Sequence, residues 1–253
     1  MFKCLIIAKR RIIAAVCLVL ALCGGAYVFS EVAPKGAAGE DNLPIYCVDT
    51  SEKKIALTFD CAWEDFDTEK ILGVLEKHGA KATFFVTGDY VRRCAESVKK
   101  FSKAGHEIGN HSDNHPHPNK LSSAGLIADT EKCSKEIENL GIEEKKLYRA
   151  PYGEYNESVV ETINKAGYKF IQWDADSLDY TGLSVQEIKE RIKKRVKSGS
   201  ILLFHTGVRN TAPALDEILS DLKEQGYSIV GADELIYKDN YIIDRSGRQM
   251  LKK

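Results

Sequence analysis

Short β-like runs alternate with amphipathic stretches from residue 55 to residue 231, and this alternation most limits what the chain can fold into. In the first amphipathic stretch, Ile71, Leu72 and Leu75 have the spacing of one buried helix face. Strand–helix alternation with short connections favours parallel strands joined by right-handed crossovers. We therefore expect an α/β fold, with a barrel favoured over an open sheet. The predicted strands are 55–60, 82–87, 107–110, 147–149, 170–174, 201–205 and 228–231. The predicted helices are 67–78, 90–104, 122–140, 156–166, 184–197 and 212–225.

The overall composition is that of an ordinary globular protein. The chain has 253 residues, of which 43% are hydrophobic and 29% are charged, and its formal net charge is −1. Nucleic-acid binding usually requires a basic face, and this balance gives no support for one. A neutral or weakly polar ligand fits the composition better.

The N-terminus departs from the globular pattern. Lys9 and two arginines precede an apolar run from Ile12 to Phe29, which approaches the roughly 20 residues needed to span a bilayer. The basic residues would stay on the cytoplasmic side. We expect an uncleaved membrane anchor, and the alternative is a signal peptide cleaved near Gly24 and Ala26. Both interpretations place the remaining chain outside the cytoplasm.

The expected organisation has one folded domain and no internal repeat. Four cysteines, Cys47, Cys61, Cys94 and Cys133, fall within this domain. We expect free buried thiols, although the sequence does not exclude disulfide pairing. The segments are a signal or anchor at 1–29, a linker at 30–44, the domain at 45–240 and a tail at 241–253.

A pair of histidines suggests a metal site. His111 and His115 lie four residues apart in the segment 109–116, which reads GNHSDNHP. Two imidazoles at this spacing meet on one side of a helical turn and can share a metal ion. Residues 106–110 resemble a short strand, and Pro116 prevents a long helix afterwards. The pair is therefore predicted at the C-terminal end of a strand, where α/β barrels collect catalytic groups; the alternative is a solvated loop.

Other polar clusters also follow predicted strands. Asp60 closes the first strand, Arg149 the fourth and His205 the sixth, while acidic residues follow the fifth. Polar groups that close apolar strands on one rim would converge on a common pocket.

The clusters together resemble the NodB-homology polysaccharide deacetylases, carbohydrate esterase family 4. The resemblance covers about residues 53–236 and is most similar to cell-wall or spore-associated deacetylases of Gram-positive bacteria. It implies a distorted (β/α) barrel of about seven parallel strands, in agreement with the alternation described above. The motifs that carry it, in chain order, are TFD at 58–60, HSxxH at 111–115, RxPY at 149–152, DxxD at 176–179 and LxH at 203–205.

The resemblance assigns roles to the residues around the expected metal ion. It implies that Asp60 is the general base and that His111 and His115 are metal ligands, with Ser112 supporting their loop. A carboxylate suits the task of taking a proton from a water that a metal has acidified. Arg149 would orient the base.

The resemblance also assigns groups to the leaving amine and the substrate. It implies that the Tyr152 backbone N–H stabilises the oxyanion. His205 would protonate the amine, tuned by a carboxylate that we assign to Asp176. Tyr152, Tyr180 and Leu203 are the expected substrate-binding residues.

The chain departs from the family pattern at two places. The family usually has a second aspartate after TFD as third metal ligand, and Cys61 occupies that position here. A thiolate can bind zinc, but Asp65 or Asp67 could also complete the site, and we favour Asp65. Cys61 is otherwise a packed core thiol. Tyr180 replaces the usual tryptophan after DxxD.

The resemblance therefore predicts a metal-dependent hydrolase that removes N-acetyl groups from an extracellular glycan, most plausibly peptidoglycan. The expected cofactor is a divalent ion, zinc first, with cobalt or manganese as alternatives. The expected partners are the N-acetylated polysaccharide and, through the N-terminal segment, the membrane; the soluble part is expected to be monomeric. The rival hypotheses are a glycan-binding or assembly protein on the same fold with a degenerate metal site, and a hydrolase of another acetylated substrate.

Overall fold

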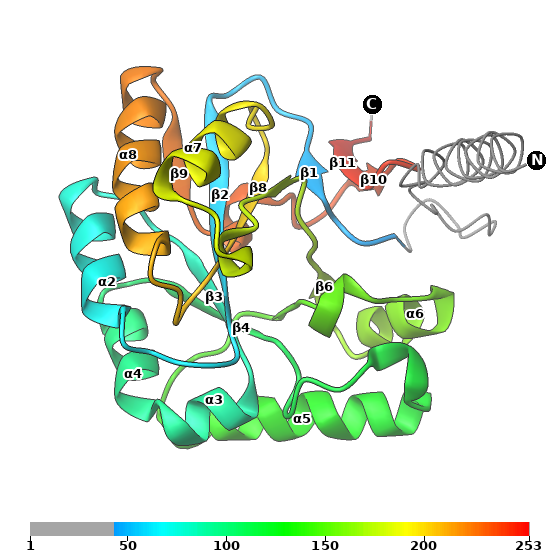
Figure 1. Ribbon diagram of the computed structural model, residues 1–253. Helices are drawn as coiled ribbons and strands as arrows, with labels where there is room; N and C mark the ends of the chain where they lie inside the picture. The colour runs from blue at the N-terminus through cyan, green and yellow to red at the C-terminus, as the bar shows by residue number, and fades with distance from the viewer. Residues whose placement is uncertain (1–42, 253) are drawn as a thin grey trace, which may run out of the picture. The chain divides into compact units, whose positions relative to one another are not determined.

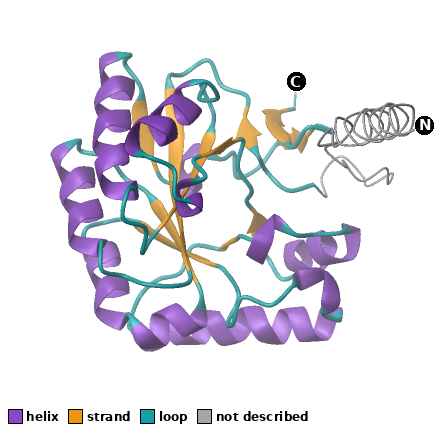
Figure 2. Ribbon diagram, viewed as in Figure 1, coloured by secondary structure: helices purple, strands orange, loops and turns teal. Residues whose placement is uncertain are grey.

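The computed structural model describes residues 43–252, and its centre is a sheet of parallel strands. The strands are β2 (Lys54–Cys61), β3 (Thr83–Val86), β4 (Glu107–Asn110), β5 (Leu147–Tyr148), β6 (Lys169–Phe170), β7 (Ala175–Asp176), β8 (Ile201–His205) and β9 (Ser228–Val230). Their order is β6-β5-β4-β3-β2-β8-β7, with β9 paired to β2, and every pairing is parallel. The strands curl into a half-barrel whose edge strands are β6 and β7, and helices lie outside it (Figures 1 and 2). The predicted fold class is confirmed.

The helices lie close to the predicted amphipathic stretches. They are α2 (Thr68–Lys77), α3 (Gly88–Arg93), α4 (Ala95–Lys103), α5 (Ser123–Asn139), α6 (Glu157–Lys165), α7 (Val185–Lys193), α8 (Thr211–Glu224) and α9 (Ala232–Leu235). Within residues 43–252, three 3₁₀ turns accompany them: η1 (Pro118–Lys120), η2 (Pro151–Gly153) and η3 (Asp179–Thr181).

The predicted helix at 90–104 is wrong as a single element. It is divided between α3 and α4 at Cys94, whose φ and ψ of −120° and 36° are not helical. The buried residues Tyr90, Val91, Val98 and Phe101 keep helical spacing across the break. Periodicity alone therefore could not reveal the interruption.

The predicted strand at 170–174 is also divided. The chain leaves the sheet after β6 and returns as β7, which pairs with β8. Between the two strands, Asp174 accepts hydrogen bonds from the Ile201 N–H at 3.0 Å and the Ser200 hydroxyl at 3.1 Å. These contacts hold the turn at the start of β8 and replace the strand pairing that the apolar pattern predicted.

A second small sheet includes the predicted tail. It contains β1 (Cys47–Val48), β10 (Tyr241–Ile243) and β11 (Arg248–Leu251), in the order β1-β11-β10. β11 runs parallel to β1 and antiparallel to β10. Residues from the C-terminal region are thereby joined to the start of the folded domain.

The N-terminal prediction lies outside the described residues. Across residues 43–252, none of the helices combines the length and apolar character needed to cross a bilayer. The apolar run at 12–29 and most of the predicted linker precede this part of the chain.

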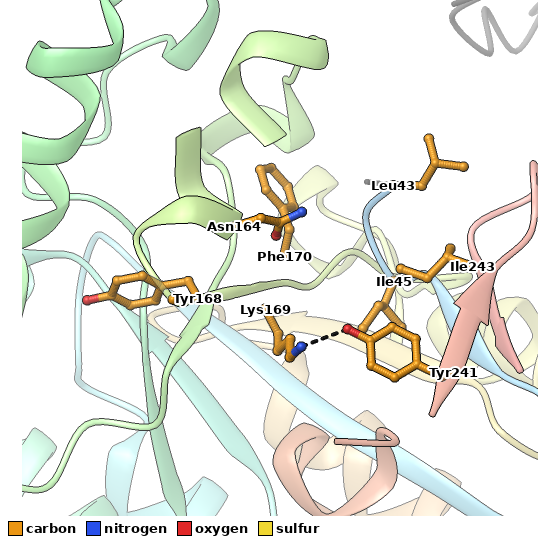
Figure 3. Close-up of a pocket in the computed structure, with 9 residues that line it drawn as sticks. Leu43, Ile45, Asn164, Tyr168, Lys169, Phe170, Tyr241 and Ile243 are labelled. Carbon is orange, nitrogen blue, oxygen red and sulfur yellow. Dashed lines mark hydrogen bonds between the residues drawn. The ribbon is translucent and has the colours of Figure 1, made fainter. Parts of the chain in front are cut away.

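A small cavity marks the base of the barrel. It has a volume of about 160 Å³ and is lined by apolar and polar side chains together, among them Ile45, Phe170 and Asn164 (Figure 3). Lys169 Nζ donates a hydrogen bond to the Tyr241 hydroxyl at 2.7 Å across it. Because Lys169 begins β6, the cavity lies at the opposite end of the strands from the predicted catalytic groups.

The buried side chain of His106 is expected to make the fold less stable in acid. Its ring is almost completely buried beside Phe84, and burial, reinforced by the charge of Lys81, lowers its pKa to about 4 from the ordinary 6.5. At this residue the native state therefore binds fewer protons than the unfolded state. The contribution of the neutral ring to stability is fully present above pH 6.5 and is lost as the pH falls towards 4. In urea titrations at several pH values, H106Q should lose about 2 kcal/mol less of its unfolding free energy than wild type over this window. If the unfolding free energies of wild type and H106Q change with pH in the same way, His106 is not the source of the acid sensitivity.

Candidate active site

The predicted catalytic groups meet at the C-terminal ends of the parallel strands. Asp60 near the end of β2 is the register partner of His205, the last residue of β8. Asn110 ends β4, and its register partner Tyr148 ends β5. The histidine loop that follows β4 and the Arg149 segment that follows β5 therefore begin side by side. Parallel pairing, together with strand alternation, places these groups on one edge and one face.

Arg149 fixes the orientation of Asp60. Its guanidinium is completely buried, and Nη1 donates to Asp60 Oδ1 at 2.9 Å and to the Thr58 hydroxyl at 2.9 Å. The guanidinium also lies 4.2 Å from the centre of the Phe85 ring. Burial alone would raise the pKa of Asp60, but electrostatic interaction with the neighbouring His111 and Arg149 side chains outweighs it and lowers that pKa. Asp60 is therefore held as a carboxylate with one oxygen left for the site.

The two histidines meet, but not on a helical turn as predicted. Ser112 and His115 both have left-handed backbone conformations, with φ of 72° and 56°. The Ser112 hydroxyl accepts a hydrogen bond from the His115 N–H at 3.0 Å, which supports the loop. The His111 and His115 ring centres lie 5.0 Å apart. The loop, rather than a helix, brings the imidazoles together.

The hydrogen bonds of His111 show how this pair could hold a cation. Its Nδ1 donates to the Arg149 carbonyl oxygen at 2.8 Å, so Nε2 bears the lone pair and faces Asp60 Oδ2 at 3.6 Å. Burial lowers the pKa of His111 and favours the neutral ring. A lone pair and a carboxylate oxygen are compatible at this separation when a cation or a proton lies between them. The free nitrogen of His111, with the His115 ring 5.0 Å away, could therefore help to hold a cation.

The residues predicted to supply a third ligand lie elsewhere. Asp65 accepts a hydrogen bond from the Ser97 hydroxyl at 2.7 Å on α4. Asp67 is buried and accepts from the N–H groups of Gly207 and Val208 at 2.8 and 3.2 Å. Within the described part of the chain, no three His, Cys, Asp or Glu side chains are grouped to hold a metal ion. The preference for Asp65 is therefore not supported, because its carboxylate is bound to a neighbouring helix.

Cys61 faces away from the catalytic edge. Thr58 and Asp60 both contact Arg149 inside the barrel, so strand alternation directs Phe59 and Cys61 towards the helices. Phe59 stacks on Phe84 there, and Cys61 belongs to the same hydrophobic core. Burial raises the pKa of the Cys61 thiol well above its ordinary value. A neutral thiol in the core is a poor metal ligand.

This orientation predicts that Cys61 contributes to stability and not to chemistry. C61A should reduce the free energy of unfolding by about 1–2 kcal/mol, because it leaves a small cavity. It should leave kcat/KM and metal content unchanged. Urea denaturation and metal analysis of the same preparation check this expectation. Loss of the metal without loss of stability would instead identify Cys61 as a ligand.

The carboxylate beside His205 is Asp179, and the assignment of Asp176 is wrong. His205 Nδ1 lies 2.7 Å from Asp179 Oδ1, while Asp179 Oδ2 accepts from the His205 N–H at 2.9 Å and the Thr211 hydroxyl at 2.6 Å. Asp176 instead accepts from the Leu178 N–H at 2.8 Å. Leu178 has a left-handed φ of 52°, and the chain reversal there carries Asp179 inwards.

Asp179 also sets the protonation of His205. Burial by itself lowers the pKa of His205, but the hydrogen bond and charge of Asp179 outweigh it, so that pKa is raised. Because Nδ1 is bound by the carboxylate, Nε2 is the ring nitrogen available to a reactant. The His205–Asp179 pair can therefore donate a proton from His205 Nε2, on the strand next to that of Asp60.

Aromatic side chains surround the catalytic groups. Trp63, Tyr152 and Tyr180 are 48%, 57% and 53% exposed. The Trp63 ring centre lies 6.0 Å from that of His115 and 5.7 Å from that of His205. Tyr152 packs on His115 at 4.5 Å, and Tyr180 packs on His205 at 4.8 Å.

The three predicted substrate-binding residues differ in exposure: two are exposed and one is buried. Tyr152 and Tyr180 face solvent beside the catalytic groups, whereas Leu203 is only 2% exposed within β8. Trp63 was assigned no role from the sequence, although an aromatic residue shortly after a strand that ends in a catalytic carboxylate could have indicated one.

Comparisons with known proteins agree with this geometry. A family model described as polysaccharide deacetylase matches residues 48–171. The chain is 38% identical to the peptidoglycan-N-acetylglucosamine deacetylase of Bacillus cereus, with 75% of this chain and 91% of the relative covered. It is 34% identical to the peptidoglycan-N-acetylmuramic acid deacetylase PdaA of Bacillus subtilis, with 76% and 75% covered. A solved pseudoenzyme of carbohydrate esterase family 4 from Bacillus anthracis superposes with a TM-score of 0.74 at 31% identity, covering 77% and 69%.

Proposed function

Since this chain belongs to the polysaccharide deacetylase family, we propose that it removes N-acetyl groups from a cell-wall glycan. The observation that carries the proposal is the pairing of Asp60 with His205 on adjacent strands, each fixed by its own partner. Arg149 fixes Asp60, and Asp179 fixes His205. A base and an acid in such proximity are suited to amide hydrolysis.

The base acts at the first step. Asp60 Oδ2 takes a proton from a water that attacks the acetamido carbonyl carbon, while Arg149 keeps the Asp60 carboxylate oriented. A divalent ion held by His111 and His115 would supply Lewis acidity and acidify that water.

The acid acts at the second step. The carbon–nitrogen bond breaks as His205 Nε2 gives its proton to the leaving amine, and Asp179 stabilises the protonated ring. The backbone N–H of Tyr152 would stabilise the negative oxygen that forms before this step. The products are acetate and a glycan with a free amino sugar.

The aromatic rim supports a sugar substrate. Trp63, Tyr152 and Tyr180 are large side chains that stay exposed beside the catalytic groups, and exposed apolar surface of this kind marks binding sites. The relatives named as peptidoglycan deacetylases support a cell-wall substrate. We therefore propose peptidoglycan as the substrate, reached outside the cytoplasm, with the N-terminal apolar run as anchor or signal. Zinc is the proposed ion because imidazole ligands suit it.

Product analysis on defined glycans tests the proposal. The full-length protein, loaded with zinc, is incubated with peptidoglycan fragments, and mass spectrometry locates any sugar that has lost its acetyl group. Acetate is measured in parallel. Deacetylation of either amino sugar, lost in H111A, is the expected result. Release of acetate from O-acetyl esters alone would overturn the amide specificity.

A glycan-binding protein on the same fold is the second candidate. Two observations favour it: Cys61 faces the core, and none of the carboxylates in the described residues completes the metal site. Fragment binding by isothermal titration, without release of acetate at any metal concentration, would establish this candidate. Turnover at the same site would exclude it.

A further inference from the structure

The loop that carries the two histidines is held in a conformation that its residues do not favour. Ser112 and His115 have φ values of 72° and 56°, in the left-handed region that is costly for residues with a Cβ. Such conformations persist only where surrounding contacts determine them. The contacts that hold this loop must therefore be strong.

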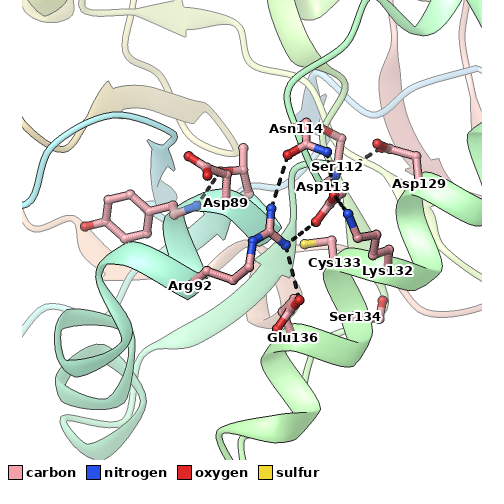
Figure 4. A network of polar contacts seen from close by, with 12 residues as sticks. Asp89, Arg92, Ser112, Asp113, Asn114, Asp129, Lys132, Cys133, Ser134 and Glu136 are labelled. Atoms are coloured by element: carbon pink, nitrogen blue, oxygen red, sulfur yellow. Dashed lines mark hydrogen bonds and ion pairs between the residues drawn. The ribbon is translucent and has the colours of Figure 1, made fainter.

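The strongest of these contacts converge on Asp113, between the histidines. Its carboxylate is 1% exposed, yet it accepts from Arg92 Nη1 at 2.6 Å and from Lys132 Nζ at 2.5 Å (Figure 4). Arg92 comes from α3 and Lys132 from α5. Asn114 Nδ2 donates to the same carboxylate at 2.6 Å, and Arg92 Nη2 donates to Asn114 Oδ1 at 3.1 Å. We refer to Arg92, Asp113 and Lys132 as the Asp113 clamp.

Backbone contacts complete the attachment of the loop. The Gly88 N–H donates to the Ser112 carbonyl at 3.0 Å, and the Asp89 N–H donates to the Asp113 carbonyl at 2.9 Å. The Asp113 N–H donates to Asp129 Oδ2 at 3.1 Å. A Cβ on Gly88 would lie 2.2 Å from Asp113 Oδ1. Glycine at this position is therefore what allows the carboxylate to close on α3.

We propose that the Asp113 clamp is a positioning device that keeps the strained loop in the conformation that presents both imidazoles to the site. Asp113 acts through the loop and does not touch the reactants. The proposal rests on the proposed function, because it assumes that His111 and His115 are working groups. The physical reason is that a buried carboxylate, bound by cationic side chains from two helices, restrains the backbone on either side of it.

The test compares D113N with E136Q in the full-length protein. D113N removes the charge of the carboxylate at nearly constant side-chain size. E136Q is the control, because Glu136 also accepts a hydrogen bond from Arg92, at 3.2 Å, but does not belong to the loop. We expect D113N to shift and broaden the histidine imidazole signals in NMR spectra and to weaken zinc binding about ten- to a hundred-fold by titration. The kcat for deacetylation should fall in D113N with little change in KM. E136Q should resemble wild type in all these measurements.

Two further variants keep the outcome decisive. G88A places a methyl group from α3 against the Asp113 carboxylate and should reproduce the spectral change. R92K keeps the positive charge at this position and should retain most of the wild-type behaviour. If D113N and G88A lower only the melting temperature and leave imidazole spectra and zinc affinity unchanged, the clamp is merely structural and the proposal is overturned. If the wild-type protein shows no deacetylation, the proposed function is refuted. The imidazole NMR signals of D113N and G88A would still show whether the clamp positions the loop.

Discussion

Replacing Asp60 with asparagine is expected to lower kcat/KM for deacetylation by about 10²- to 10⁴-fold. The amide cannot accept the proton that the carboxylate takes from water. Its carbonyl oxygen can still accept a hydrogen bond from Arg149, which otherwise donates to Asp60 at 2.9 Å. The fold should therefore survive, and the binding of glycan fragments should change little.

Asp174 provides a matched control for this variant. Its carboxylate is also largely buried and accepts hydrogen bonds, but it lies beside the first residues of β8, away from the catalytic edge. D174N should reduce stability and leave the rate constants near those of wild type. Kinetics at saturating and limiting substrate, with denaturation of both variants, separate the two effects. Equal loss of kcat in D60N and D174N would mean that Asp60 acts only through folding.

Replacing His205 with glutamine is expected to lower kcat by about 10²- to 10⁴-fold. The amine would then have to leave without a proton from the ring, although the glutamine side chain fills similar space. Binding should persist, because Trp63 and Tyr180 flank the ring and remain in place. Poorer substrate leaving groups should be affected more than better ones, and a series of activated acetamides measures this.

The partner of His205 gives the expected pH dependence. The proton donor must be charged, and Asp179 raises the pKa of His205, so activity extends to higher pH than an unpaired ring would allow. D179N removes the charge, lowers that pKa and should move the alkaline limb of the kcat profile to lower pH. D176N, whose carboxylate lies on the Leu178 N–H, should move it much less. An alkaline limb that follows Asp176 and ignores Asp179 would refute the assignment.

Much of the barrel could be predicted because its strands are apolar and continuous. β2, β3, β4 and β8 match the runs identified from the sequence, and their parallel order follows from the alternation with helices. β10 and β11 were not predicted. Both lie in a short patch without alternation, and β11 becomes a strand by pairing with β1, about two hundred residues earlier in the chain.

The site could be predicted as a set of residues but not as a set of contacts. The motifs identified Asp60, Arg149 and His205, and the structure brings them together. The carboxylate beside His205 was misassigned because two aspartates share one motif, and only the left-handed turn at Leu178 decides which one faces inwards. The Asp113 contacts were missed for a similar reason, since Arg92 and Lys132 come from helices far apart in the sequence.

The parallel pairing of β1 with β11 has a consequence for how the protein is made. Cys47 and Arg248 are register partners, so this contact can form only after residue 248 has been synthesised. Contacts between such distant segments carry a large loop-closure cost and tend to form late. The residues of the catalytic edge lie between Thr58 and Thr211, so none of them takes part in this late pairing. We therefore expect the β1–β11 pairing to complete the small second sheet at a late step of folding.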